Sequence, residues 1–214
     1  SLAGHTLNVT SLQYDPDGRF LVSSGWDGMV RVWRGTNGEE QLTVRAHIKE
    51  IAALAVSPDG NTVASASWDR TVRLWNTANG ALKDTLPTHS NEVWALAYSP
   101  DGQQIVSGCR GGEIQFWALE PKQLVARTKR NGGDVRCLCF SPDGQRLVSG
   151  SGRNVGEPGE IVVWNARTKT PERTMEIPRG RVQAVGWSPD GRRVAAGGQD
   201  GTILVWAAGT WEQQ

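Results

Sequence analysis

The tetrapeptide SPDG occurs at 57–60, 99–102, 141–144 and 188–191, and its variant DPDG occurs at 15–18. In a tight turn, Pro fixes φ near the value that the second position requires, and Gly accepts a positive φ that other residues resist. Successive copies start 42, 42, 42 and 47 residues apart. Self-similarity at a period of this size indicates stacked repeat units, so five related units account for the whole chain.

Each repeat contains four runs with the composition of short β-strands. Three of them alternate β-branched or apolar residues with smaller or polar ones and are bounded by Gly, Asp or Asn. The fourth is polar enough to be an edge strand. Each repeat is therefore predicted to be a four-stranded antiparallel sheet without a helix. The runs of the second repeat are IAALAV at 51–56, NTVASAS at 61–67, RTVRLW at 70–75 and ALKDTL at 81–86.

The first strand of each repeat indicates how the sheets pack. A large residue, such as Leu54 or Leu96, stands between small neighbours, such as Ala53 and Ala55. Because successive side chains point to opposite faces, each sheet has one bulky and one thin face, both largely apolar. Such sheets bury their faces by stacking around an axis, as in a β-propeller. The expected fold is all-β, a single propeller domain (residues 1–214) of five four-stranded blades, from repeats at about 1–44, 45–86, 87–127, 128–175 and 176–214.

Two short motifs frame the repeat. AGH at 3–5, AH at 46–47 and TH at 88–89 precede the first strand, and a Trp closes the third strand of every repeat. By these motifs the sequence resembles the WD-repeat β-propeller family, and five phased copies make the resemblance specific. The family usually has Asp after the final Trp. Here that position holds Arg34, Asn76, Ala118, Asn165 and Ala207.

The resemblance implies a tetrad of hydrogen-bonded side chains in each blade. In the family, a His before the first strand, a Ser or Thr of the second strand, an Asp of the next turn and the Trp of the third strand form it. The first two repeats match all four positions, the third has Gly111 in place of the Asp, and the last two match less. The matching positions hold His5, Ser23, Asp27 and Trp33; His47, Ser65, Asp69 and Trp75; His89, Ser107 and Trp117; Asn131, Ser149 and Trp164; and Pro178, Ala196, Asp200 and Trp206.

The tetrads also bear on catalysis. Ser, His and Asp are the groups of a hydrolase triad, which requires an exposed nucleophile, a base and an orienting carboxylate. The trio occurs in two repeats and every member has a structural role, so we expect no enzyme. The tetrads use all three histidines, and Cys109, Cys137 and Cys139 lack the C-x-x-C spacing of zinc or redox sites. The sequence therefore predicts no metal and no cofactor.

Charge, apolar run length and cysteine content indicate the class of partner and the cellular compartment. Lys and Arg number 23 against 22 Asp and Glu, so net charge predicts neither nucleic acid nor membrane as a partner. The longest apolar run, IAALAV, is too short to cross a bilayer. An odd number of cysteines without a signal peptide favours a reducing cytoplasm.

The function is therefore expected to be the binding of a partner at the protein surface. In each blade the loop before the first strand and the turn between the second and third strands emerge on one end, and the resemblance implies partner binding there. Tryptophans hold three of these positions on neighbouring repeats, and Trp is enriched in binding hot spots. A structural alternative is that Trp26 and Trp68 only cover the blade end. The candidate protein-binding residues are Trp26, Trp68, Trp94, Glu50, Glu92, Arg110, Asp134, Arg136, Arg181 and Gln199, with Asn8, Thr10, Ala52 and Gln183 at the other equivalent positions.

The fourth and fifth repeats are basic on the same end. The five extra residues of the fourth repeat place GRNVGEPGE, 152–160, in a loop there, and insertions in repeat proteins often map to the binding face. Asp134, Glu157 and Glu160 offset part of the charge. A protein or peptide partner that combines an apolar segment with acidic or phosphorylated groups fits this end. The basic residues are Lys129, Arg130, Arg136, Arg153, Arg179 and Arg181.

We therefore expect a non-catalytic protein-interaction scaffold, and three alternatives stay open. In the first, the chain is a sensor or scaffold segment of a larger multidomain protein. In the second, it binds a small molecule or catalyses a reaction in the central funnel, with Glu92, Asp134 and Arg136 around the ligand. In the third, it binds nucleic acid with a salt-dependent affinity. The repeat phase also predicts that GTWEQQ at 209–214 and SLAGH at 1–5 complete one sheet, within a monomer ring or with a second copy.

Overall fold

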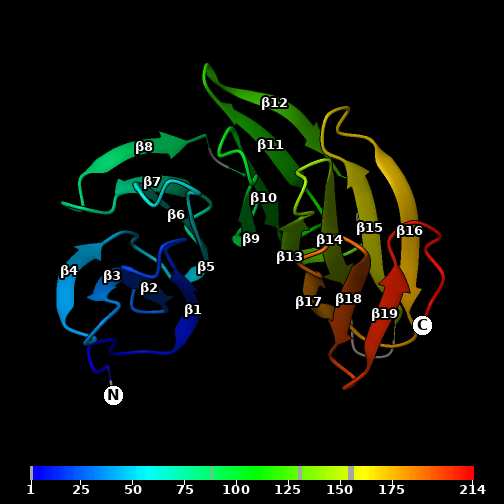
Figure 1. Ribbon diagram of the computed structural model, residues 1–214, viewed down its shortest axis with the longest axis horizontal. Helices are drawn as coiled ribbons and strands as arrows, with labels where there is room; N and C mark the ends of the chain where they lie inside the picture. The colour runs from blue at the N-terminus through cyan, green and yellow to red at the C-terminus, as the bar shows by residue number, and fades with distance from the viewer. Residues whose placement is uncertain (1, 88, 130–131, 154–156) are drawn as a thin grey trace. The chain divides into compact units, whose positions relative to one another are not determined.

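The computed structural model describes residues 2–87, 89–129, 132–153 and 157–214 (Figure 1). Within these ranges it holds nineteen β-strands and no helix, so the all-β class predicted from the sequence is confirmed. Accordingly, the described part of the chain offers no helix with the length and apolar character needed to cross a membrane. The chain divides into two compact units, Ser1–Tyr98 and Ser99–Gln214.

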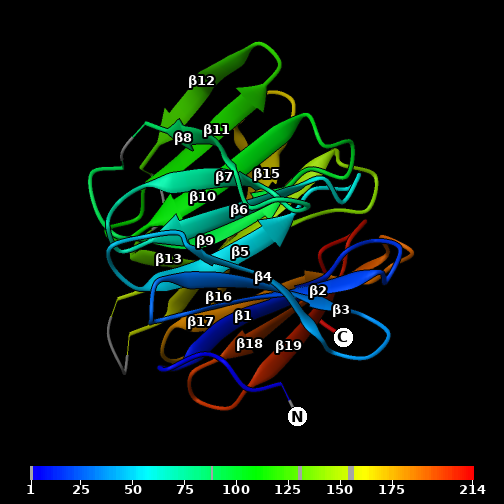
Figure 2. The same cartoon turned by 90° about the vertical axis from the view of Figure 1, so that its left-hand side faces the viewer.

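The first unit contains two complete antiparallel sheets and one further strand (Figure 2). The first sheet, in the order β1-β2-β3-β4, has the strands β1 (Val9–Tyr14), β2 (Phe20–Gly25), β3 (Met29–Arg34) and β4 (Glu40–Arg45). The second, in the order β5-β6-β7-β8, has β5 (Ile51–Val56), β6 (Thr62–Ser67), β7 (Val72–Asn76) and β8 (Leu82–Leu86). The last strand of the unit is β9 (Val93–Tyr98).

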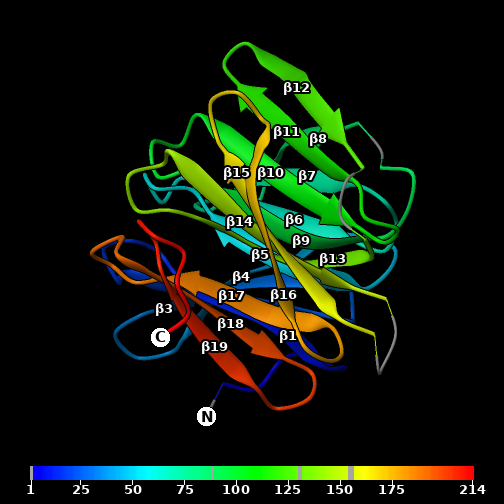
Figure 3. The same cartoon turned by 90° about the vertical axis from the view of Figure 1, so that its right-hand side faces the viewer.

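The second unit contains the remaining ten described strands (Figure 3). Those of the third sheet, whose order is β12-β11-β10-β9, are β10 (Gln104–Cys109), β11 (Ile114–Leu119) and β12 (Lys122–Thr128). The fourth sheet follows in the order β13-β14-β15-β16, with β13 (Asp134–Phe140), β14 (Arg146–Gly152), β15 (Gly159–Asn165) and β16 (Pro171–Ile177). The fifth has the order β17-β18-β19, with β17 (Val182–Trp187), β18 (Arg193–Gly198) and β19 (Ile203–Ala207).

The fifth sheet has three strands within the described ranges, where the sequence predicts four. A single antiparallel bridge joins Trp206 to Gln213, and the Gln214 N–H donates to the Val205 carbonyl over 2.9 Å. Three residues follow Trp211, whereas the fourth strands of the other sheets have five to seven. The pairing therefore begins where the fourth strand was predicted and stops before a strand is formed.

The recurring turn fixes where the second strand of each repeat starts. Ser99 Oγ donates to Asp101 Oδ1 over 2.5 Å and accepts the Gln104 N–H over 2.9 Å. In the DPDG variant, Asp15 Oδ1 instead accepts the N–H of Phe20 over 2.9 Å. A carboxylate thus replaces the hydroxyl without changing the turn.

The first strand of every repeat whose pairing with the second strand is described carries a β-bulge near its start. In β1, Val9 pairs with Gly25 and Ser11 with Ser24, which leaves Thr10 as an extra residue. A bulge bends the strand and re-aims the side chain of the extra residue. These positions are among those that the family resemblance assigns to the binding end. The equivalent extra residues of β5, β13 and β17 are Ala52, Arg136 and Gln183.

The apolar cores lie between neighbouring sheets of each unit. In the first unit, Leu54 of β5 is 5% exposed and shares a cluster with Val22 of β2 and Val30 of β3. In the second unit, Val182 of β17 shares a cluster with Val148 of β14. The first strand of one repeat thus covers the inner strands of the repeat before it, which is the face-to-face stacking that the sequence predicts.

Candidate functional site

The tetrad of the second repeat is a complete hydrogen-bonded chain. Trp75 Nε1 donates to Ser65 Oγ over 2.9 Å, and Ser65 Oγ lies 2.7 Å from His47 Nε2. His47 Nδ1 lies 2.8 Å from Asp69 Oδ2. The Trp N–H only donates and a carboxylate only accepts, so the chain begins with a donor at Trp75 and ends with an acceptor at Asp69. Burial alone would raise the pKa of Asp69, but hydrogen bonds from His47 and Thr71 outweigh burial and hold that pKa well below its usual range.

The first repeat has the same geometry. Trp33 Nε1 donates to Ser23 Oγ over 2.8 Å. Ser23 Oγ lies 2.7 Å from His5 Nε2, and His5 Nδ1 lies 2.9 Å from Asp27 Oδ2. Identical sequence spacing thus produces identical bonding.

The later repeats each lack at least one of the four residue types of the tetrad, and the bond between Trp and Ser is described in two of them. Trp117 Nε1 lies 3.3 Å from Ser107 Oγ, and Trp164 Nε1 donates to Ser149 Oγ over 2.8 Å. Asn131, which stands at the His position of the fourth repeat, falls outside the described residues. The bond between Trp and Ser therefore forms with or without a His at the start of the repeat.

The serines of the two complete tetrads are poor nucleophile candidates. Ser23 and Ser65 are buried, and each oxygen already accepts an indole N–H. A triad nucleophile must be accessible to its substrate and free to attack it. The geometry therefore favours a role in joining strands over a role in catalysis.

Two of the three cysteines, Cys137 and Cys139, have thiols that stay protonated at neutral pH. All three are free thiols, and Cys109 is buried. Burial raises the pKa of Cys137 to about 12 and raises the pKa of Cys139 as well. Because the thiolate is the form that attacks electrophiles and binds metals, Cys137 and Cys139 are inert at neutral pH.

Three tryptophans, Trp26, Trp68 and Trp94, lie side by side in the first unit and are called the Trp row below. Trp26 lies in the turn between β2 and β3, Trp68 in the turn between β6 and β7, and Trp94 in β9. The ring centroids of Trp26 and Trp68 are 6.0 Å apart, and those of Trp68 and Trp94 are 6.4 Å apart. The rings are tilted by 48° and 42°, which is a favourable aromatic arrangement. The structure thus brings three predicted site residues into contact.

The Trp row is an apolar surface. The N–H of Trp26 donates to the Asn8 carbonyl and that of Trp68 to the Glu50 carbonyl, over 2.9 and 3.0 Å, so the backbone positions both rings. The indole nitrogens of Trp68 and Trp94 are buried, which leaves hydrocarbon as the accessible part of both rings. Trp26 is 41% exposed.

Ile48 is a further exposed apolar residue near the turn that holds Trp26, and it was not among the predicted site residues. It is 78% exposed in the loop before β5. The carbonyl of the adjacent His47 lies so close to Gly28, in the turn after Trp26, that an added Cβ there would approach it to 2.6 Å. The equivalent positions hold Thr6 and Ser90. The sequence signal for this residue was therefore an apolar side chain at an otherwise polar loop position.

Arginines gather in the second unit. Arg181 Nε donates to the Arg153 carbonyl over 2.8 Å, and its Cα lies against Gly152, where an added Cβ would approach it to 2.7 Å. Burial lowers the pKa of Arg136, and the charge of the nearby Arg181 lowers it further. Arg130, another basic residue of the predicted set, falls outside the described residues. The structure therefore brings Arg181 beside both Arg136 and Arg153.

Other predicted site residues make mainly backbone contacts. The Gln199 N–H donates to the Arg181 carbonyl over 2.9 Å, as the Trp26 and Trp68 amides do in their repeats. Asp134 Oδ1 accepts the Gly111 N–H over 3.0 Å. Arg110 is exposed. The turn between the second and third strands is thus tied to the start of the first strand in the first, second and fifth repeats.

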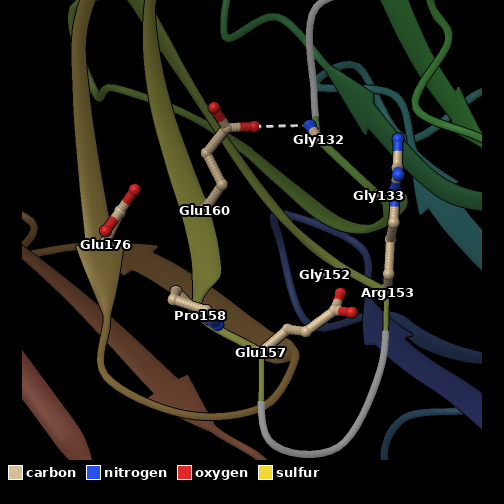
Figure 4. A pocket seen from close by; sticks show the side chains of 8 residues that line it. All are labelled: Gly132, Gly133, Gly152, Arg153, Glu157, Pro158, Glu160 and Glu176. Atoms are coloured by element: carbon tan, nitrogen blue, oxygen red, sulfur yellow. Dashed lines mark hydrogen bonds between the residues drawn. The ribbon is translucent and has the colours of Figure 1, made fainter.

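A cavity of about 300 Å³ lies at the insertion of the fourth repeat (Figure 4). Glu160 reaches across it, and its Oε2 accepts the Gly132 N–H over 2.6 Å. The three residues expected around a ligand in the central funnel, Glu92, Asp134 and Arg136, do not line it. The lining residues are Gly132, Gly133, Gly152, Arg153, Glu157, Pro158, Glu160 and Glu176.

Comparison with known proteins finds similarity along most of the chain. A family model described as the IFT122 first beta-propeller matches residues 8–155, which is more than half of the sequence. A model described as WD domain, G-beta repeat matches residues 169–207. The curated Periodic tryptophan protein 2 homolog of Dictyostelium discoideum is 36% identical over 44 residues, which cover 21% of this chain and 5% of that protein. The chain thus spans a small fraction of that relative.

Proposed function

From the premise that this chain belongs to the WD-repeat β-propeller family, we propose that it is a non-catalytic scaffold that binds a protein or peptide partner. Propellers of this family generally act as protein-interaction scaffolds and are generally non-catalytic. The partner binds on the end that carries the turns between the second and third strands. The free cysteines support a reducing, cytoplasmic location for this function.

The Trp row is the observation that carries the proposal. Three large rings, each in contact with the next, form an apolar surface at one end of the first unit, and the exposed Ile48 lies in the loop that contacts the turn after Trp26. Contiguous exposed apolar patches on proteins mark interaction sites, whereas single exposed apolar residues are ordinary. Trp is also the residue type most enriched among interface hot spots. An apolar segment of the partner, placed across the rings, would displace water from all three.

The structural alternative predicts a different surface. If Trp26 only covered the end of its blade, its ring would be buried by its own repeat, whereas it is 41% exposed. Packing against Trp68 orders the ring without hiding it. A rigid, partly exposed ring loses little conformational entropy when a partner binds, which favours recognition.

An enzymatic role is supported less well. Both complete Ser, His and Asp sets have a buried Ser oxygen that accepts an indole N–H. The cavity of the fourth repeat holds three glutamates and one arginine, and the Glu160 carboxylate already accepts a backbone N–H. The Ser, His and Asp sets thus lack an accessible nucleophile, and the described residues that line the cavity include no Ser, Cys, Thr or Lys to serve as one.

The test is affinity capture followed by measurement on the purified pair. Partners captured with the unaltered protein are identified, and the Kd of each is measured with the variants Trp26→Ala, Trp68→Ala and Trp94→Ala. Each loss should weaken binding by about tenfold or more, the scale of a hot-spot residue. Leu82→Ala is the matched control, because Leu82 is an exposed apolar residue on the outer strand β8 of the same unit.

The control separates the Trp row from general apolar adhesion. We expect Leu82→Ala to bind as the unaltered protein does. Partners that bind all three tryptophan variants with unchanged affinity would place the binding surface elsewhere. Equal losses in the tryptophan variants and in Leu82→Ala would show non-specific adhesion instead of a site.

A further inference from the structure

Two arginines of the second unit occupy positions that the fold brings together. Arg136 is the extra residue of the bulge in β13, so its side chain is aimed away from the regular alternation of the strand. Arg181 immediately precedes β17. Both side chains are partly buried. Their environment is therefore fixed by the backbone more closely than that of a freely solvated surface residue.

The first unit shows where the side chain of such a bulge residue points. Thr10, the bulge residue of β1, donates from Oγ1 to the Ile51 carbonyl over 2.7 Å, at the start of the next first strand. In the second unit the residue equivalent to Ile51 is Val182, which follows Arg181. Cys137, next to Arg136, brings its Sγ within 4.0 Å of the Val182 carbonyl. Repeat equivalence and this contact both place Arg136 over the start of β17.

Arg181 is held in position through its Nε and its backbone, and its other N–H donors take no part in this. Its Nε is bound to the Arg153 carbonyl, and the close approach of Gly152 fixes its backbone. A guanidinium carries five N–H donors, so four remain on the two Nη atoms. Among the described residues, these Nη atoms form no hydrogen bond or ion pair. Asp134 is the acidic neighbour of Arg136, and its Oδ1 accepts the Gly111 N–H.

We propose that Arg136 and Arg181 bind a phosphate group on the protein partner. Two fixed guanidinium charges held close together repel each other, and a phosphate monoester supplies nearly two negative charges with several acceptor oxygens. A single carboxylate supplies one charge. The inference deepens the proposed function and rests on it only for the statement that a protein carries the phosphate.

Inorganic phosphate is the probe for the site itself. In a titration at constant ionic strength, balanced with chloride, the Nε–H resonances of Arg136 and Arg181 should shift and saturate in the millimolar range. Arg181→Gln and, independently, Arg136→Gln should each weaken phosphate affinity by about tenfold, because each removes one charged donor group. Arg192→Gln is the matched control, since Arg192 directly follows the SPDG tetrapeptide of the fifth repeat, at the end opposite to Arg181.

The outcomes separate this inference from the proposed function. Trp68→Ala should bind phosphate normally, so unchanged partner affinity in Trp26→Ala, Trp68→Ala and Trp94→Ala, with intact phosphate binding, would overturn the Trp row alone. Equal phosphate affinity in Arg181→Gln, Arg136→Gln and Arg192→Gln would overturn the phosphate site and leave the Trp row standing. Binding of single-stranded oligothymidylate at least tenfold tighter than phosphate, lost in Arg181→Gln, would assign the arginines to nucleic acid and overturn the protein-borne phosphate.

Discussion

The second and fifth repeats share a strand order but differ in what holds their strands together. The second has a complete tetrad, whereas Pro178 and Ala196 stand at the His and Ser positions of the fifth. Val72 of β7 is 1% exposed, and Ile203 at the same position of β19 is 74% exposed. Even so, the three strands of the fifth sheet pair in the register of the second. The tetrad is therefore not what creates the sheet.

The fifth repeat is supported by aromatic packing instead. Trp187 of β17 meets Trp211 edge to face, with ring centroids 6.0 Å apart, and the Arg146 guanidinium lies 5.9 Å from the Trp211 ring. Trp211 has φ of 60°, at the turn position where the second repeat has Gly80 with φ of 69°. A bulky residue in that region is strained, so packing around Trp211 must compensate for the strain. The two repeats reach one architecture through different interactions.

Removing the central hydroxyl of the tetrad should produce the largest difference between these repeats. Ser65→Ala leaves two buried groups, the Trp75 N–H and His47 Nε2, without their partner, at a cost of about 1–3 kcal/mol each. The reciprocal change, Ala196→Ser, gives the fifth repeat the Ser of the tetrad without the His. It should alter the free energy of unfolding by less than about 1 kcal/mol. Urea unfolding followed by circular dichroism measures both.

The inferred difference between the second and fifth repeats is wrong if Ser65→Ala and Ala196→Ser change the free energy of unfolding by similar amounts. Equal stability of Ser65→Ala and the unaltered protein would mean that the tetrad contributes nothing. A large gain in Ala196→Ser would mean that the fifth repeat lacks only a hydroxyl to be bonded like the second.

Burial of the equivalent strand positions should give the next largest difference. Val72→Ala removes two methyl groups from a fully packed site and should lower the free energy of unfolding by about 2 kcal/mol. Ile203→Ala removes more carbon from an exposed position and should cost less than about 0.5 kcal/mol. The measurement is the urea midpoint at constant m-value. A cost for Ile203→Ala equal to that of Val72→Ala would show that Ile203 is covered in solution.

The repeat period, the turns and the alternation of strand residues were enough to predict the sheets, because each depends on residues close in sequence. Ser99 and Gln104, for example, form their turn bond within six residues. The three-stranded fifth sheet was not predicted, because the sequence pattern of the strand continues to Gln214 while the pairing stops at one bridge. The expectation that the two chain ends complete one sheet stays a prediction.

Long-range features of the site were harder to predict. The Trp row could be located because the repeat places Trp26, Trp68 and Trp94 at equivalent ends of neighbouring blades. Ile48 was missed because it lies in a loop, where one apolar residue gives no periodic signal. The bulge in β13 was missed because an extra residue does not change the composition of the strand, so the neighbourhood of Arg136 and Arg181 had to come from the structure.

The pH dependence of the unfolding free energy should show the smallest difference between the second and fifth repeats. Burial would raise the pKa of Asp69, but the hydrogen bonds from His47 and Thr71 hold it far below the value of about 3.9 of an unfolded chain. A depressed folded pKa stabilises the protein at pH values above the unfolded pKa, and this contribution is lost as the pH falls below it. Unfolding free energy should therefore decline from about pH 4 downward. Asp69→Asn should flatten part of this decline.

Asp200 is the matched position in the fifth repeat. Hydrogen bonds from the Thr202 hydroxyl and backbone N–H lower its pKa as well, but the side chain is exposed and has no His beside it. Solvent screens such a group, so Asp200→Asn should change the acid decline less than Asp69→Asn does. Urea midpoints between pH 3 and pH 7 compare the two variants with the unaltered protein. If both variants lose the same acid sensitivity, the buried bond to His47 adds nothing beyond a local turn, and the tetrad would have to be regarded as a packing unit without an electrostatic role.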